Sequence, residues 1–176
     1  MNQSTYQLIS YLLRYPNEQM VEVLPEIERE LDTIENTRVR ENLQKFITET
    51  RNISLDEWIS HYVDHFDFGR LTNLYVTYLK LGEQRERGLE LLKLKKYYEA
   101  HGFEVTDKEL PDYLPVILEF CSSVPVKASN ELLEMHDKAI KVIQEKLSEN
   151  NSYYRFLFDA LFIHMEGNGL TFSQER

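Results

Sequence analysis

The chain has few of the residues that build cross-links and tight turns. Its 176 residues include one cysteine, six glycines and five prolines. A single cysteine, Cys121, excludes an internal disulfide and any zinc site built from several cysteines. It lies in an apolar stretch, so we expect a small packed side chain rather than a nucleophile. The scarcity of glycine and proline argues against a β protein of many strands, which needs more turns. No stretch alternates between polar and apolar residues for long enough to require a strand.

The sequence is also poor in basic residues and long apolar runs. Its net charge of −10 and pI near 5.0 disfavour nucleic acid as a partner, because such binding depends on neutralising phosphates with Lys and Arg. The charge suits a basic or neutral partner. There is no run of about 18 apolar residues, and the first ten residues lack a basic region followed by an apolar core. We therefore expect a cytoplasmic protein without direct membrane insertion.

Motifs for catalysis are absent as well. We find neither a Gly-x-Ser-x-Gly nucleophile elbow nor a glycine-rich phosphate loop. His61 and His65, four residues apart on a predicted helix, are the best candidates for metal ligands. A helical wheel places His61 away from the apolar face and His65 on its flank, and no third ligand is apparent. A metal-dependent hydrolase using His61 and His65 stays an alternative, but we expect no enzyme activity, metal or cofactor.

The chain is rich in helical periodicity. Apolar residues, 42% of the total, recur every three or four positions through most of the sequence. Capping boxes at Ser4–Gln7 and Ser54–Glu57 mark two helix starts, and Pro25 predicts a kink or break. We expect helices at about 4–15, 18–35, 38–51, 54–66, 71–82, 83–101, 112–122, 130–148 and 152–165. The sequence therefore predicts an all-α, single-domain helical bundle of seven to nine helices over residues 1–166, followed by a flexible tail at 167–176.

The predicted helices 83–101 and 112–122 carry apolar residues over most of their circumference, so we expect both to be largely buried. Pro115 fits the first turn of the second one, because the missing proline N–H has no helical partner there. Asp112 is placed to cap that helix, an interaction worth about 1 kcal/mol. The feature at odds with burial is Glu119, a carboxylate that must be paired or protonated on a mostly buried helix.

Two interpretations of the arginines at the start of helix 83–101 are equally open. Arg85 and Arg87 either pair with neighbouring acids on a solvated surface or hold Asp67, Asp112 or Glu119 in a polar junction between helices. Tyrosine is frequent in the same part of the chain. Most of these rings should lie in or beside the core with their hydroxyls reaching water, while some are candidates to line a groove. They are Tyr75, Tyr78, Tyr97, Tyr98 and Tyr113.

Five stretches, in this order, resemble the nitrate reductase delta subunits, which are molybdenum cofactor assembly chaperones of the NarJ type within the TorD/DmsD/NarJ group. Each is short and weak alone, but the ordered set is specific and covers nearly the whole chain. The stretches are Leu12–Pro16, Phe66–Asp67, Leu74–Tyr78, Gly82–Gly88 and Glu109–Phe120. The resemblance implies a TorD/NarJ-like helical fold and a cytoplasmic chaperone that is not part of the finished enzyme.

The same resemblance implies a partner and a set of residues. The partner is the apo catalytic (alpha) subunit of respiratory nitrate reductase, bound chiefly through its N-terminal segment, so that molybdenum cofactor is inserted before membrane docking. This is a role in anaerobic nitrate respiration and nitrate assimilation for a protein that binds unfolded chains. A generic helical adaptor remains an alternative, and a homodimer is left open. The implied partner-binding residues are Glu109, Pro111, Asp112, Tyr113, Pro115 and Glu119, with Asp67, Tyr75, Tyr78, Arg85 and Arg87.

Overall fold

The computed structural model describes residues 2–69, 71–78 and 85–172. This part of the chain forms eight α-helices, and its only β pairing is an isolated bridge between Tyr75 and Tyr113. The predicted all-α class and the predicted number of helices are confirmed. The elements are α1 (Asn2–Leu12), α2 (Glu18–Glu30), the 3-10 turn η1 (Leu31–Thr33), α3 (Thr37–Arg51), α4 (Leu55–Tyr62), the π-helical turn η2 (Val63–Asp67), α6 (Arg85–Ala100), α7 (Leu114–Ser123), α8 (Val126–Glu149) and α9 (Arg155–Gly167).

Side-chain caps fix several helix starts. The Ser54 hydroxyl accepts a bond from the Glu57 backbone N–H at 3.1 Å, so the helix start predicted at Ser54 is confirmed. The start predicted at Ser4 is wrong, because α1 already begins at Asn2 and residue Ser4 lies inside it. Asparagines cap α2 and α3 instead, through backbone N–H groups that would otherwise lack a partner.

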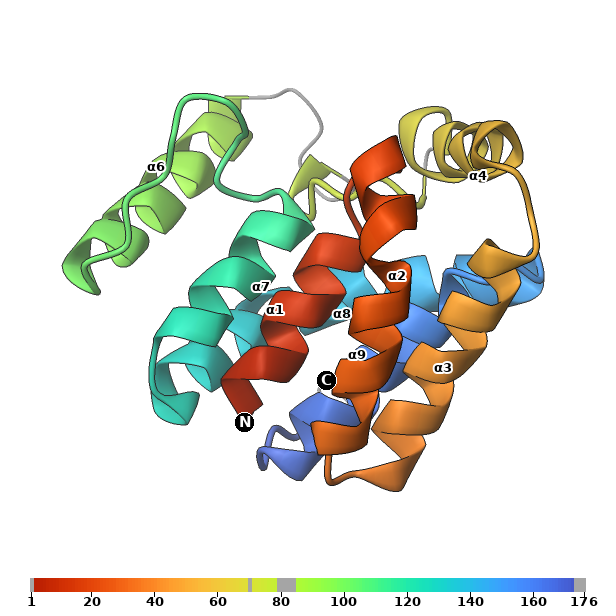
Figure 1. The fold of residues 1–176 in the computed structure, drawn as a ribbon. Coiled ribbons are helices and arrows are strands. Elements are labelled where there is room, and N and C mark those ends of the chain that lie inside the picture. The colour runs from red at the N-terminus through yellow and green to blue at the C-terminus, as the bar shows by residue number, and fades with distance from the viewer. Residues whose placement is uncertain (1, 70, 79–84, 173–176) are drawn as a thin grey trace.

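The centre of the bundle is built from α1, α7 and α9. Helix α1 packs against α7 and α9, α3 packs against α9, and α8 lies against α7 and α9 (Figure 1). Every residue of α7 from Leu114 to Leu118 is buried, as are Phe120 and Cys121. The expectation that α7 is central and that Cys121 is a packed side chain is confirmed. A second buried contact connects α4 to the start of α9: the Trp58 indole N–H donates to the Tyr154 hydroxyl at 2.8 Å.

Three helix predictions need correction. The chain stays helical through Pro25, so the alternative of a helix break there is wrong. The physical reason is that buried side chains on both sides of Pro25 hold the two halves of α2 against the core. Residues 71–77 form turns and a bridge rather than a helix, and 79–82 lie outside the described residues. Helix α6 is far less buried than predicted: Leu89 and Leu92 are 55% and 49% exposed. It stands at the edge of the bundle (Figure 1), so its second apolar stripe has no covering helix.

The segment after α9 folds back on the bundle. The Asn168 side chain donates to the Tyr6 hydroxyl at 3.2 Å, and Leu170 is buried. The Phe172 ring packs against Phe162 with centroids 4.9 Å apart. Residues 168–172 thus make contacts that we did not expect of a flexible tail, and 173–176 lie outside the described residues. In the described part of the chain, no helix combines the length and apolar character needed to cross a membrane.

Candidate functional site

Two non-helical segments pair at the start of α7. The Val76 N–H donates to the Asp112 carbonyl at 3.0 Å, and the Leu114 N–H donates to the Leu74 carbonyl at 2.8 Å. This pairing explains why residues 71–77 do not form the predicted helix, since their backbone groups bond to a segment far along the chain instead. It brings two of the stretches that carry the family resemblance into contact.

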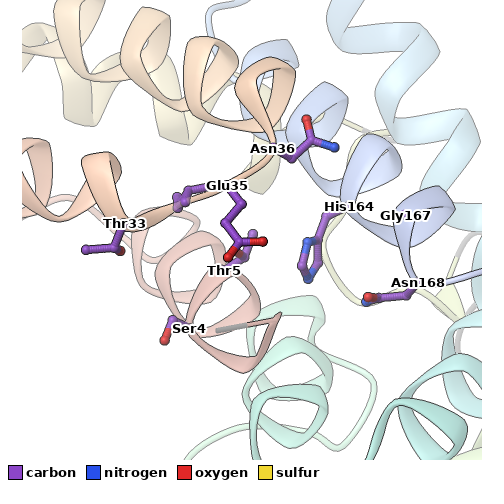
Figure 2. A pocket seen from close by; sticks show the side chains of 9 residues that line it. Ser4, Thr5, Thr33, Glu35, Asn36, His164, Gly167 and Asn168 are labelled. Carbon is purple, nitrogen blue, oxygen red and sulfur yellow. The ribbon is translucent and has the colours of Figure 1, made fainter.

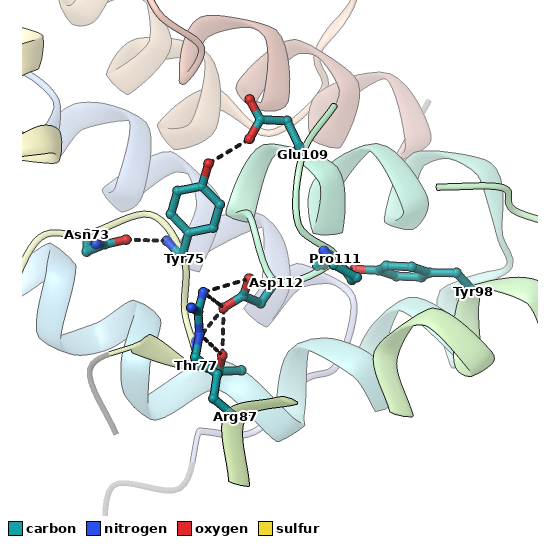
Figure 3. Close-up of polar contacts among 8 residues, drawn as sticks. All are labelled: Asn73, Tyr75, Thr77, Arg87, Tyr98, Glu109, Pro111 and Asp112. Carbon is teal, nitrogen blue, oxygen red and sulfur yellow. Dashed lines mark hydrogen bonds and ion pairs between the residues drawn. The ribbon is translucent and has the colours of Figure 1, made fainter. Parts of the chain in front are cut away.

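The Asp112 carboxylate is fully buried at this crossing and is held by three donors. Its Oδ2 accepts from the Thr77 hydroxyl at 2.6 Å, the Thr77 N–H at 3.2 Å and the Arg87 guanidinium at 3.1 Å (Figure 3). Arg87 Nε also donates to Thr77 Oγ1 at 3.2 Å. We call Thr77, Arg87 and Asp112 the buried triad; it ties α6 to the start of α7.

The triad decides between two interpretations made from the sequence. Arg87 holds Asp112 in a polar junction, so that interpretation is confirmed for this pair. The prediction that Asp112 caps α7 is wrong: the N-cap position is Tyr113, and no side chain caps this helix. The reason is that the Asp112 side chain turns toward Thr77, while its backbone carbonyl bonds to Val76.

Four tyrosines from different parts of the chain form a row beside the triad. The Tyr15 and Tyr62 rings meet edge to face at 5.4 Å, the hydroxyls of Tyr62 and Tyr113 are 3.3 Å apart, and the Tyr113 and Tyr75 rings stack at 4.9 Å. The row ends where the Tyr75 hydroxyl donates to the Glu109 carboxylate at 2.6 Å (Figure 3). We call Tyr15, Tyr62, Tyr113 and Tyr75 the tyrosine row.

Burial keeps the inner hydroxyls of this row protonated. It is the main cause that raises the pKa of Tyr62, Tyr75 and Tyr113, and the nearby Asp67 carboxylate adds to the increase at Tyr62 and Tyr113. We expected such hydroxyls to reach water, and here they bond to one another and to Glu109. The row is therefore a fixed hydrogen-bonded cluster, buried at Tyr62 and Tyr113, rather than a source of protons.

Exposed apolar side chains occur on the segments that carry or flank the tyrosine row. Tyr15 is 49% exposed at one end, and Phe68, directly after Asp67, is 80% exposed. Leu110 is 43% exposed, and its carbonyl accepts a bond from the Tyr113 N–H at 3.1 Å. With Leu71, these residues form what we call the apolar rim. Large apolar side chains exposed close together are typical of surfaces that bind another protein.

The remaining predicted residues are placed in different surroundings. The Pro111 carbonyl accepts a bond from Tyr98, and the Pro115 carbonyl accepts one from Ser10, each at 2.6 Å. The Tyr78 ring lies 5.4 Å from the Arg87 guanidinium carbon. Arg85 is exposed at the start of α6, and the structure does not bring it to the triad.

Glu119 is not the buried carboxylate that we expected. Its side chain is 51% exposed and forms an ion pair with Arg14 at 3.1 Å, because it occupies the one face of α7 that reaches solvent. Sequence reasoning missed Arg14, Tyr15, Tyr62 and Thr77. The stretches Leu12–Pro16 and Leu74–Tyr78 already contained Arg14, Tyr15 and Thr77, so that signal was available, whereas nothing in the sequence singled out Tyr62.

Two hollows follow α1 away from the Arg14–Glu119 pair. A groove of about 580 Å³ lies between α1 and α2, from that pair to Ser4. Ser4 also borders a second hollow, of about 370 Å³, between α1, the loop after η1 and the end of α9. Figure 2 shows Glu35 and the buried His164 facing this space from opposite walls.

The histidine pair does not resemble a metal site. His61 stacks on Tyr153 with ring centroids 4.1 Å apart, so the prediction that it points away from the core is wrong. Its Nε2 lies 2.6 Å from the Ser152 hydroxyl, and the His65 Nδ1 lies 2.9 Å from the His61 carbonyl. Burial lowers the pKa of His61 to about 4. Among the described residues, no group of three His, Cys, Asp or Glu side chains is placed to hold a metal.

Comparison of the sequence with known proteins assigns the chain to a family. The family model described as "Nitrate reductase delta subunit" matches residues 32–160. The "Probable nitrate reductase molybdenum cofactor assembly chaperone NarJ" of Bacillus subtilis (strain 168) is 41% identical over 173 residues, which are 98% of this chain and 94% of that protein. The chaperone NarJ of Escherichia coli (strain K12) is 34% identical over 102 residues, 58% of this chain and 43% of its own length. The probable chaperone NarW of the same strain is 30% identical over 165 residues, 94% and 69% respectively.

Proposed function

Because this chain belongs to the nitrate reductase delta subunit family, we propose that it is a molybdenum cofactor assembly chaperone of nitrate reductase and not an enzyme. It binds the apo catalytic (alpha) subunit, chiefly through that subunit's N-terminal segment. It acts in the cytoplasm and supports cofactor insertion before the subunit docks at the membrane. The observation that carries the proposal is 41% identity along 98% of the chain to a relative named as such a chaperone.

We propose that the predicted site residues divide into two groups by burial. Asp112, Tyr113 and Pro115 are buried and Arg87 is nearly so, so a docked partner would not touch them without unfolding this corner. They act indirectly, by fixing the tyrosine row and the apolar rim. The partly or fully exposed members of the predicted set are the ones that contact the partner: Asp67, Tyr75, Tyr78, Arg85, Glu109, Pro111 and Glu119.

This surface suits a helical peptide segment. The apolar rim supplies contact area around Tyr15 and Phe68, and tyrosine rings offer such area at low entropic cost. The bonded hydroxyls of the tyrosine row hold its rings in place before binding, which lowers the entropy lost when a partner docks. The two alternatives are not favoured, because the histidine pair lacks a ligand geometry and a generic adaptor does not account for the family match.

Calorimetry with a synthetic peptide of the catalytic subunit's N-terminus tests the proposal. We expect saturable binding near pH 7 to the folded chain. Absence of binding, with circular dichroism showing an intact fold, would overturn it.

Cells lacking this protein should contain nitrate reductase that is poor in molybdenum cofactor and low in activity. A generic adaptor is distinguished by copurification, since only the chaperone brings down apo nitrate reductase, and ultracentrifugation of the same sample shows whether the chain forms a homodimer.

A further inference from the structure

The groove between α1 and α2 has an apolar floor. Leu8 and Tyr11 line it from α1, and Val23 and Ile27 line it from α2. Helix α1 contains no charged residue from Asn2 to Leu12, so that wall is neutral. Along α2 the groove runs from Gln19 to Glu30, which is about 16 Å, or about three helical turns, at a rise of about 1.5 Å per residue.

A row of carboxylates lies at the opposite edge of the groove: Glu30 lines it, and Glu22 and Glu26 continue the same line on the exposed face of α2. Glu22, Glu26 and Glu30 are spaced by four residues on α2, and all three are exposed. On a helix this spacing sets them in one line, directly beside the line that supplies Val23 and Ile27 to the floor. Among the residues that the structure describes, no side-chain hydrogen bond or ion pair involves these three carboxylates, and like charges at this spacing repel one another.

Cations at this groove are scarce. Among the described residues that line it, Arg14 carries the only positive charge, and that charge is paired with Glu119 at 3.1 Å. Beyond Ser4, the hollow of Figure 2 adds another carboxylate, Glu35. The groove therefore combines an apolar floor and one neutral wall with an acidic edge on α2.

We propose that the α1–α2 groove is the docking surface for a basic amphipathic helix of about three turns. The partner's apolar stripe lies on Leu8, Tyr11, Val23 and Ile27, and its Lys or Arg residues, four positions apart, face Glu22, Glu26 and Glu30. This rests on the proposed function in taking the N-terminal segment of the catalytic subunit as that helix. The groove begins at the ion pair between Arg14 and Glu119, and Glu119 is on α7. A peptide in the groove therefore ends near the α7 helix that starts beside Asp112.

The test replaces the carboxylate row in the full chain. One variant carries Glu22→Gln, Glu26→Gln and Glu30→Gln. A control with the same change in net charge carries Glu41→Gln, Glu49→Gln and Glu99→Gln, which are exposed on α3 and α6. Two probes are titrated by calorimetry: the N-terminal peptide of the catalytic subunit, and a designed helix of about 14 residues with leucines on one face and lysines four apart.

We expect the groove variant to bind both probes about tenfold more weakly than the control, since three surface ion pairs each contribute about twofold. Raising the salt concentration should weaken binding to the natural chain more than to the groove variant. A further variant, with lysine at the same three positions, should recover binding of a designed helix in which glutamate replaces lysine.

The two proposals fail in different ways. Equal affinity of the groove variant and the control for the catalytic-subunit peptide would overturn the groove and leave the chaperone function standing. If the natural chain binds the designed helix through the groove but not the catalytic-subunit peptide, the groove stands and the proposed partner is wrong. Binding of neither probe to the folded chain would overturn both.

Discussion

Replacing Asp112 with alanine tests whether this carboxylate anchors α6 to the start of α7. The side chain is fully buried and accepts bonds from Thr77 Oγ1, Thr77 N and Arg87 Nη2. Its removal leaves a buried N–H and a guanidinium group that is only 12% exposed without their acceptor. Breaking a buried ion pair by deleting one partner costs about 3–5 kcal/mol. We expect the free energy of unfolding to fall by about 3 kcal/mol, at the lower end of that range, because Arg87 is part of the edge helix α6 and can turn toward water.

Urea denaturation measures this loss as a lower free energy of unfolding. In a thermal scan, the same change corresponds to a fall of about 6–12 °C in Tm for a chain of this size. Glu119→Ala is the matched control on the same helix. It breaks the exposed pair with Arg14, whose side chains are 38% and 51% exposed, and should cost no more than about 0.5 kcal/mol.

A double-mutant cycle separates the ion pair from the rest of the triad. Arg87→Leu combined with Asp112→Asn should cost clearly less than the sum of the two single changes, because either one alone leaves a partner unpaired. If Asp112→Ala costs about 1 kcal/mol or less, no more than the loss of a helix cap, the reasoning from burial is refuted. Strict additivity in the cycle would refute it equally.

The remaining predictions concern other parts of the bundle. Burial lowers the pKa of His61 to about 4 in the folded chain, so between pH 6.5 and 4 the unfolded chain binds more protons and stability should fall as the pH falls. Urea denaturation at pH 7 and at pH 5 should show that the free energy of unfolding falls by about 1–2 kcal/mol, and His61→Gln should reduce that fall. An unchanged pH dependence in the variant would contradict this. Cys121 is 1% exposed and burial raises its pKa, so a thiol reagent should label it only as the chain unfolds; rapid labelling of the native chain would show that α7 is not packed as described. Ser54→Ala should lower the free energy of unfolding by about 1 kcal/mol, since it removes the cap on the Glu57 N–H, and no change in urea denaturation would show that water replaces the cap.

Much of the fold could be predicted because it depends on local patterns. Helical spacing of apolar residues, the Ser54 cap and proline tolerance at Pro115 are properties of a few neighbouring residues, and each agrees with the structure. The central position of α7 also followed from its sequence, since a helix that is apolar on every side has no face to present to water. Where local patterns failed, as for residues 71–77, pairing with Asp112 and Leu114 overrode them.

The candidate site could be predicted only as a set of stretches. Their order indicated the family, and Arg87 was one of two arginines considered as partners for Asp112. No local pattern distinguishes Arg87 from Arg85, because the choice depends on where α6 sits relative to the start of α7. The tyrosine row is likewise a product of four separate segments, and burial of Asp112 results from their meeting.

The sequence by itself therefore determined the helical class, the central helix and the family, because periodicity, capping and motif order are written along the chain. Only the tertiary structure decided what the acidic residues do. It buried Asp112 against Arg87, left Glu119 at the surface with Arg14, and set Glu30 in a groove with Glu22 and Glu26 beside it. The physical reason is that the energy of a carboxylate depends on its exposure to water and on the charges that face it, and both are set by residues distant in the sequence.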